Sequence, residues 1–173
     1  MRRVEEALRV AGGGDRLMVD GRFDLATALA YAKELAPLQL RWFEEPGDPL
    51  DYHLNCALIE AYGGPVATGE NLFSAIDTLN LVRFGGMRAD CDVFQMDPGL
   101  SYGLTEYARM LQILESHGFD RAAAIPPGAP RRRARLRPRA EGGAGPPDPP
   151  AGRLRHSCSV RQEHAFAGGL GIE

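Results

Sequence analysis

Lysine is nearly missing from this chain, because Lys33 is the only one among 173 residues. Cysteine is also scarce: Cys56, Cys91 and Cys158 are an odd number at unrelated spacings, which indicates neither a disulfide framework nor a zinc site and suits a reducing compartment. No apolar run approaches the roughly 20 residues that a membrane helix needs. The first ten residues lack the apolar core of a signal peptide. We therefore expect a soluble, cytoplasmic protein without a membrane partner.

Charge is distributed unevenly along the chain. Residues 126–173 contain nine arginines and four acidic residues, whereas residues 1–125 contain 19 acidic residues and 11 basic ones. The acidic part argues against nucleic acid as a partner. A third of residues 126–173 are Pro or Gly, a composition that cannot bury enough apolar surface to form a core. We expect a folded domain over residues 1–126 and a disordered tail over 127–173, with a basic tail for an anionic partner as the alternative.

The first part alternates between two hydrophobic periodicities. Short apolar runs predict five strands, at residues 15–20, 38–45, 65–71, 92–97 and 122–127. Helical patterns predict five helices, at residues 2–11, 24–36, 48–64, 74–86 and 101–118, with Asp24 and Ser74 as N-caps. Alternation of this kind with short loops is typical of parallel βαβ units. We expect an α/β fold, a partial TIM-type barrel of about five parallel strands with the helices outside.

Four acidic residues end successive predicted strands, namely Asp20, Glu44, Glu70 and Asp97. Their separations are 24, 26 and 27 residues, about one βα unit each. In a parallel barrel the carboxyl ends of the strands meet on one face, where catalytic groups lie. Acids that converge there repel one another unless a divalent cation holds them, and oxygen-only ligation suits Mg²⁺. The alternative is that each acid merely forms a turn or caps a helix.

The second predicted strand ends in two adjacent acids, Glu44 and Glu45. Side chains alternate between the two faces of a strand, so Glu44 shares a face with Trp42 and Glu45 shares a face with Phe43. One of the two carboxylates can therefore point at a metal while the other lies against a neighbouring element or the rim.

Several segments resemble a known family. "LMVD" (17–20), "WFEEP" (42–46), "TGEN" (68–71) and "QMD" (95–97) are similar, in order and spacing, to the metal-site motifs of the enolase superfamily, in its mandelate racemase group. The longer segments "GDPLDYHLNCAL", "ATGENLFSAIDTLNLVRFGGMRAD" and "LSYGLTEYARML" most closely resemble the D-tartrate dehydratases within that group. The resemblance covers about residues 2–126 and implies an N-terminal capping domain followed by a modified TIM barrel.

The resemblance also implies a reaction and its site. It implies Mg²⁺-dependent removal of water from a sugar acid through an enediolate, with D-tartrate giving oxaloacetate, in a homo-oligomeric enzyme that binds a small carboxylate substrate. The site residues it implies are Asp20, Glu44 and Glu70 as Mg²⁺ ligands, Asp97 as the acid that orients a catalytic histidine, and Asn71 and Glu45 as neighbours of the ligands or of the substrate.

The sequence departs from the family at the proton-transfer groups. Lys33 lies in a predicted helix and does not match the family's lysine base, and Pro127 stands where the family has its catalytic histidine. Gly21 follows Asp20 directly, two residues earlier than the family pattern has it. The capping domain and the first barrel strands have no counterpart in these residues. We therefore expect an inactive fragment.

Other interpretations stay open. The chain could be another acid-sugar dehydratase or racemase of the same superfamily, a non-catalytic protein that binds a metal or a partner, or a pseudogene product. Close resemblance stops abruptly at Pro127, which favours the hypothesis that residues 127–173 are an out-of-frame translation.

Overall fold

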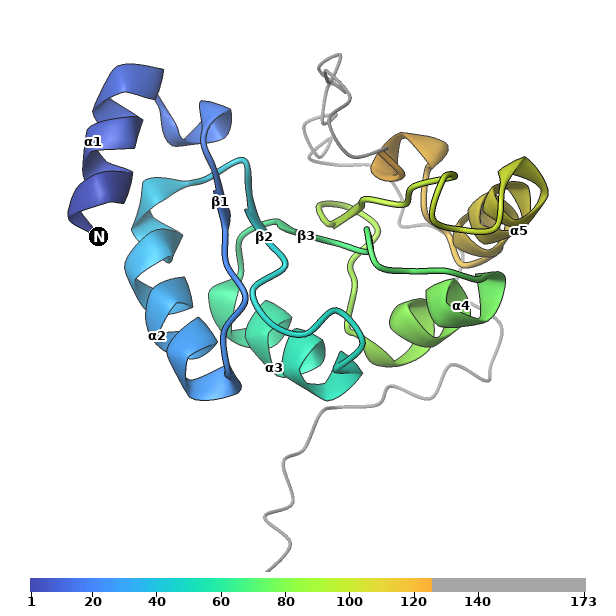
Figure 1. The fold of residues 1–173 in the computed structure, drawn as a ribbon. Helices are drawn as coiled ribbons and strands as arrows, with labels where there is room; N and C mark the ends of the chain where they lie inside the picture. The colour runs from blue at the N-terminus through green and yellow to red at the C-terminus, as the bar shows by residue number, and fades with distance from the viewer. Residues whose placement is uncertain (126–173) are drawn as a thin grey trace, which may run out of the picture. The chain divides into compact units, whose positions relative to one another are not determined.

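A parallel sheet forms the centre of the computed structural model, which describes residues 1–125 (Figure 1). Its four strands are β1 (Met18–Asp20), β2 (Trp42–Glu44), β3 (Val66–Thr68) and β4 (Val93–Phe94). They are paired in sequence order, β1-β2-β3-β4, and every pair is parallel. The predicted α/β fold with parallel strands is thus confirmed.

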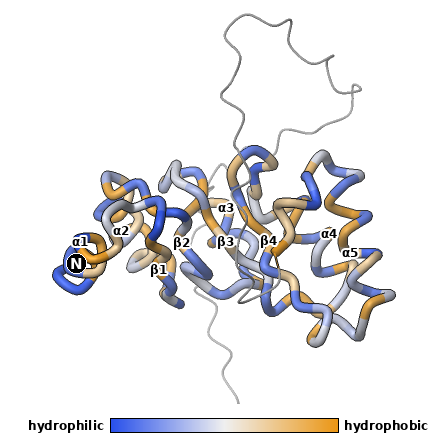
Figure 2. Tube along the Cα trace, turned by 90° about the horizontal axis from the view of Figure 1, so that it is seen from above, coloured by the Kyte–Doolittle hydropathy of each residue, from blue (hydrophilic) through white to orange (hydrophobic). Residues whose placement is uncertain are grey.

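Five α-helices alternate with these strands. They are α1 (Arg2–Ala11), α2 (Leu25–Leu35), α3 (Tyr52–Tyr62), α4 (Ala75–Phe84) and α5 (Leu104–Ser116). Helices α2, α3 and α4 lie on the same side of the sheet (Figure 1), and each helix from α2 to α5 packs against the next. Apolar and polar segments alternate along α4 and α5 (Figure 2), as expected for helices that bury one face. No helix within residues 1–125 combines the length and the apolar character that crossing a membrane requires.

The helix starts follow from side-chain capping. Asp24 accepts a hydrogen bond from the Thr27 backbone N–H at 2.8 Å, and Ser74 forms a reciprocal capping box with Asp77. Both predicted N-caps are thereby confirmed. Helix α3 ends where Gly63 adopts a φ of 70°, a left-handed conformation that suits glycine.

The strands are shorter than the apolar runs that predicted them. The first run begins in a 3₁₀ turn, η1 (Gly14–Arg16), and the second is preceded by another, η2 (Ala36–Leu38). Pro37 lies in the first residues of η2, where its fixed φ suits a helical turn and its missing N–H costs nothing. Turn chemistry therefore takes over the ends of the predicted strands.

The predicted fifth strand is present, within residues 1–125, only as a single bridge. A 3₁₀ turn, η3 (Arg121–Ala123), occupies its start, and Asp120 caps that turn by accepting from the Ala122 N–H. Ala124 then pairs in parallel with Phe94, and the Ile125 N–H donates to the Phe94 carbonyl at 2.7 Å. Alanine is depleted in strands, so a run of alanines gives way readily to a turn. Residues 126–173, including the predicted tail, lie outside the described residues.

The two faces of the sheet carry different clusters. Phe43, Val66 and Phe94 are fully buried in the core that the helices cover. Trp42, Ala67 and Val93 form a second, smaller cluster with Ile125 on the opposite face. This separation follows from side-chain alternation and confirms the predicted orientation of Trp42 and Phe43.

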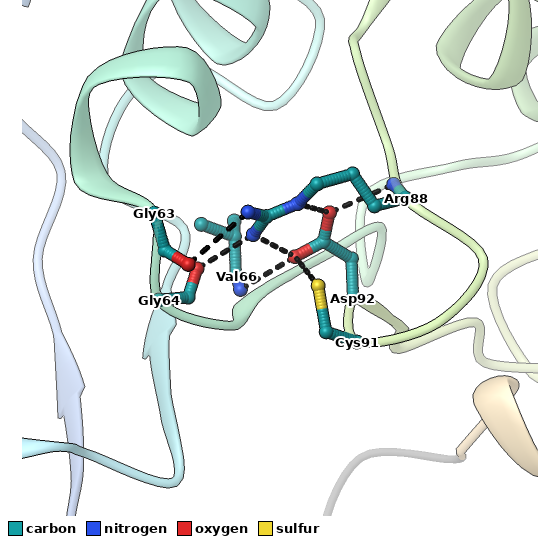
Figure 3. A network of polar contacts seen from close by, with 6 residues as sticks. All are labelled: Gly63, Gly64, Val66, Arg88, Cys91 and Asp92. Carbon is teal, nitrogen blue, oxygen red and sulfur yellow. Dashed lines mark hydrogen bonds and ion pairs between the residues drawn. The ribbon is translucent and has the colours of Figure 1, made fainter. Parts of the chain in front are cut away.

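A network of polar contacts ties the amino-terminal ends of β3 and β4 to the end of α3 (Figure 3). Buried Asp92 accepts hydrogen bonds from the Val66 N–H at 2.9 Å and from the backbone N–H, Nε and Nη2 of Arg88. Arg88 also donates to the carbonyls of Gly63 and Gly64 at the end of α3. Hydrogen bonding to Asp92 raises the pKa of Arg88, and burial is the main reason that the pKa of neighbouring Cys91 rises to about 12.

Candidate metal centre at the carboxyl ends of the strands

The predicted site acids all lie at or shortly after the carboxyl ends of the strands. Asp20 and Glu44 are the last residues of β1 and β2. Glu70 lies two residues beyond the end of β3, and Asp97 lies three residues beyond the end of β4. Because the sheet is parallel, these ends share one edge. This edge is opposite the one that the Arg88–Asp92 network closes.

Asp20 and Glu44 are aligned across neighbouring strands. The register of β1 and β2 pairs Asp20 directly with Glu44, so both side chains point to the face of Trp42. Asp20 is exposed and Glu44 is half-buried. The indole Nε1 of Trp42 donates to Glu44 Oε2 at 2.8 Å, which holds this carboxylate against its own strand.

Glu45 lies against the end of the neighbouring strand. Its side chain is 7% exposed, and its backbone has a φ of 36°, in the left-handed region that glutamate seldom adopts. Both carboxylate oxygens accept from Asn71 Nδ2, at 3.2 and 3.4 Å, and Oε1 also accepts from the Gly69 N–H at 3.5 Å. Burial raises the pKa of Glu45, and the nearby charge of Glu70 raises it further, against the opposing effect of these donors.

Glu70 belongs to a tight turn after β3. The Leu72 N–H donates to the Gly69 carbonyl at 3.2 Å, which closes the turn around Glu70 and Asn71. Gly69 has a φ of 114°, a conformation that suits glycine alone. Glu70 and Asn71 are both half-buried.

Asp97 makes the contacts of a turn residue. Its Oδ1 accepts from the Gly99 N–H at 2.7 Å, and its carbonyl accepts from the N–H groups of Leu100 and Ser101. Burial and, secondly, the charge of Asp97 raise the pKa of Tyr107 on α5. Position 127, where the family has its histidine, lies outside the described residues, so the catalytic role of Asp97 stays a prediction.

The donor chemistry of this edge suits a hard cation, but the carboxylates do not form a cluster. Within residues 1–125, no three His, Cys, Asp or Glu side chains form a group that could hold a metal ion. Asp20 and Glu44 are paired across β1 and β2, whereas Glu45 interacts with the charge of Glu70 and accepts hydrogen bonds from neutral donors, Asn71 and Gly69. The structure contains carboxylate oxygens of the type that Mg²⁺ prefers, and the ligand set Asp20, Glu44 and Glu70 stays a prediction.

Two contributions to this edge escaped the sequence analysis. Trp42 provides the donor for Glu44, and its position two residues earlier on the same face is the signal that could have shown it. Gln95 lies two residues before Asp97, is 7% exposed, and its Oε1 has no hydrogen-bond partner among the described residues. Gln95 is part of the motif QMD, but it was assigned no role from the sequence.

Comparison with known proteins gives a consistent family. The sequence model "Enolase C-terminal domain-like" matches residues 1–134, so the match ends shortly after the domain boundary predicted at residue 126. The 3,6-anhydro-alpha-L-galactonate cycloisomerase of Streptomyces coelicolor is 36% identical over 87 residues, which are 49% of this chain and 24% of that protein. The L-talarate/galactarate dehydratase of Salmonella typhimurium is 28% identical over 120 residues, 68% of this chain and 29% of that protein.

A solved structure agrees with these relatives. The L-talarate dehydratase from Polaromonas sp. JS666, complexed with Mg and L-glucarate, has a TM-score of 0.59 and 30% sequence identity over 68% of this chain and 32% of that chain. The chain thus spans about a quarter to a third of the length of the proteins that it matches.

Proposed function

Because this chain belongs to the Enolase C-terminal domain-like family, we propose that it provides the metal-binding edge of a Mg²⁺-dependent sugar-acid dehydratase. The observation that carries the proposal is the placement of acids at successive strand ends, with Asp20 and Glu44 in register and Glu70 just beyond the next strand. That placement puts oxygen donors on the edge of a parallel sheet where barrel enzymes carry their catalytic groups.

Asp20, Glu44 and Glu70 are the residues that would hold Mg²⁺. When bound there, the cation supplies positive charge that polarises a substrate carboxylate. Trp42 fixes one rotamer of Glu44 through its indole N–H, and so lowers the number of side-chain conformations open to that ligand. Asp97 would orient a histidine, as the resemblance implies, if one is supplied from outside the residues described.

The substrate we propose is D-tartrate, on the basis of the segments at residues 47–58, 67–90 and 100–111 that resemble D-tartrate dehydratases. A second candidate is a longer sugar acid such as L-talarate or galactarate. The names of the Salmonella and Polaromonas relatives favour it.

Proton transfer is the part of the reaction for which these 173 residues provide the least. The single lysine, Lys33, is an exposed residue of α2 and does not belong to the sheet edge that carries the acids. Position 127 is proline, which has no titratable group. We therefore propose that the chain binds Mg²⁺ but does not by itself complete the dehydration.

Calorimetric titration of the 173-residue chain with Mg²⁺ tests the proposal. Wild type should bind, and Glu70→Gln should bind at least about tenfold more weakly, because it loses an anionic ligand. Glu34→Gln is the matched control, since Glu34 is an exposed carboxylate on α2 and its loss should leave binding unchanged. Equal binding by wild type and Glu70→Gln would remove Glu70 from the ligand set.

A further inference from the structure

Glu45 contacts both neighbours of Glu70 with one buried carboxylate. Oε1 accepts from the Gly69 N–H at 3.5 Å, and both oxygens accept from Asn71 Nδ2, at 3.2 and 3.4 Å. Gly69 and Asn71 are the residues immediately before and after Glu70. The carboxylate therefore holds the chain on either side of this acid without being a part of the ligand set itself.

The backbone of Glu45 anchors the same contact. Its N–H donates to the Ala67 carbonyl at 2.9 Å, so the residue is bonded to β3 through its main chain as well as its side chain. Its φ of 36° breaks the alternation of β2 at this residue and directs the side chain across to the end of β3. A solvent-facing glutamate would need neither the unusual φ nor the buried position.

The turn that carries Glu70 has little freedom to adopt another shape. Gly69 has a φ of 114°, and a Cβ at this position would lie 3.1 Å from Leu72 Cδ1. Leu72 is fully buried, so it cannot easily move away. Packing against buried Leu72 and the hydrogen bonds to Glu45 thus both hold the turn in this shape.

We propose that Glu45 is a positioning residue that clamps Gly69 and Asn71 and thereby sets the direction in which Glu70 is presented to the cation. The inference rests on the proposed function only in taking Glu70 as a ligand. The clamp itself is a property of the folded chain, and it can be tested without metal.

The first measurement is hydrogen–deuterium exchange of the metal-free, full 173-residue chain. Glu45→Ala should raise the exchange rate at the Gly69 amide by about tenfold, because a charged acceptor is lost. Glu45→Gln should keep most of the protection, since its amide oxygen can still accept from Gly69 and its NH₂ can donate to a rotated Asn71 amide. Glu34→Ala removes an exposed carboxylate of equal charge and should change nothing. Unchanged exchange at Gly69 in Glu45→Ala would overturn the proposal.

The second measurement is Mg²⁺ affinity, followed through the fluorescence of Trp42, the only tryptophan in the chain. Glu45→Ala should weaken binding about tenfold, and Glu45→Gln should restore it to within about threefold of wild type. The double variant Glu45→Ala/Asn71→Ala should bind no more weakly than the weaker single variant, because the two residues act through one contact.

The outcomes separate the clamp from the metal site. Faster exchange in Glu45→Ala with unchanged Mg²⁺ affinity would show that the clamp does not position Glu70, and would overturn the proposal. Failure of wild type to bind Mg²⁺ would refute the proposed function, while the exchange experiment would still decide whether the clamp exists. If Glu45→Ala does not fold, Asn71→Ala removes the Asn71 half of the clamp and leaves the Gly69 hydrogen bond in place, and unchanged Mg²⁺ affinity in that variant would overturn the proposal.

Discussion

Trp42 and Glu44 form a hydrogen-bonded pair within a single strand, two residues apart and on one face. The indole N–H is 2.8 Å from Glu44 Oε2, and the guanidinium of Arg41 lies over the ring with its Cζ 5.1 Å from the centroid. The pair is partly buried, so the carboxylate depends on this donor more than an exposed one would. A side chain expected to bind a cation is thus held in place by a neutral neighbour.

Trp42→Phe should lower the free energy of unfolding by at least about 1–2 kcal/mol, because the hydrogen bond to a charged acceptor and part of the buried indole ring are both lost. Denaturant unfolding followed by circular dichroism measures the change. Tyr102→Phe is the control, since Tyr102 is 82% exposed and the loss of its hydroxyl should have no measurable effect. Equal stability of Trp42→Phe and wild type would mean that the indole N–H does not stabilise Glu44.

Residue-level predictions from the sequence succeeded where local chemistry decides. Asp24 and Ser74 cap their helices because short polar side chains before an apolar periodic run reach the first free N–H groups. The left-handed φ of Glu45 could not be predicted, since only its contacts with the end of β3 make that conformation favourable. The Trp42–Glu44 hydrogen bond could not be predicted either, because strand alternation shows that the two side chains share a face but not which rotamers they adopt.

At the scale of elements, the Arg88–Asp92 pair joins three parts of the chain that are distant in sequence. Asp92 contacts the start of β3, and Arg88 contacts the end of α3, so the loop before β4 holds both. Asp92 is fully buried at its side chain, whereas Arg88 is 29% exposed. The contacts close the amino-terminal end of the sheet, the end that in barrel proteins serves stability more than catalysis.

Asp92→Asn should lower the free energy of unfolding by about 2–4 kcal/mol, because Arg88 then stays in place without its counter-charge. The matched control is Asp48→Asn. Asp48 pairs with Arg22 at 3.4 Å, but both side chains are more than half exposed, and such a pair contributes below about 1 kcal/mol. Urea titration of both variants measures the difference, and similar losses in the two would argue against a role for burial.

Element boundaries show where sequence reasoning is limited. All five helices and the four strands occur where periodicity predicted them, yet β4 comprises two residues of a predicted run of six. Apolar runs do not by themselves distinguish a strand from a turn, and η2, which has no buried residue, is built from the same apolar residue types as the neighbouring strand end. The predicted fifth strand shows the same ambiguity. Its alanines, near Ala123, are compatible with a strand, but they form a 3₁₀ turn capped by Asp120.

At the scale of the molecule, the sheet of the described residues has an open edge. Within residues 1–125, β1 pairs only with β2, and Met18 on β1 is 43% exposed. Unpaired strand edges invite pairing with a second copy.

We expect the 173-residue chain to self-associate, which size-exclusion chromatography at several concentrations would detect. Met18→Lys should reduce association, since lysine on an edge strand disfavours pairing. Leu104→Lys places the same charge on an exposed apolar position of α5, 78% exposed and outside β1, and should reduce it less. A compact monomer at all concentrations would contradict the prediction.

We expect no dehydration of D-tartrate by the isolated chain, because removal of a proton needs a base within hydrogen-bond reach and Lys33 lies on α2. Pro127→His alone should not restore activity, since it supplies an acid without a base. The assay is oxaloacetate formation with Mg²⁺ present, with L-talarate and galactarate as parallel substrates. Turnover by wild type that Glu70→Gln abolishes would show that the catalytic groups are elsewhere in this chain.

The raised pKa of the Cys91 thiol makes its rate of alkylation a probe of local opening in this fold. A thiol reacts with alkylating reagents as the thiolate, and the shift of its pKa from 9.0 to about 12 leaves about one thiol in 10⁴ ionised at pH 8. Once the loop before β4 opens, the ordinary pKa returns and labelling should quicken roughly a thousandfold. The same shift stabilises the fold below pH 9 and is lost between pH 9 and about 12, because the unfolded thiol ionises first. The rate at which iodoacetamide labels Cys91 therefore reports how often the loop before β4, at the amino-terminal end of the sheet, opens while the rest of the protein stays folded.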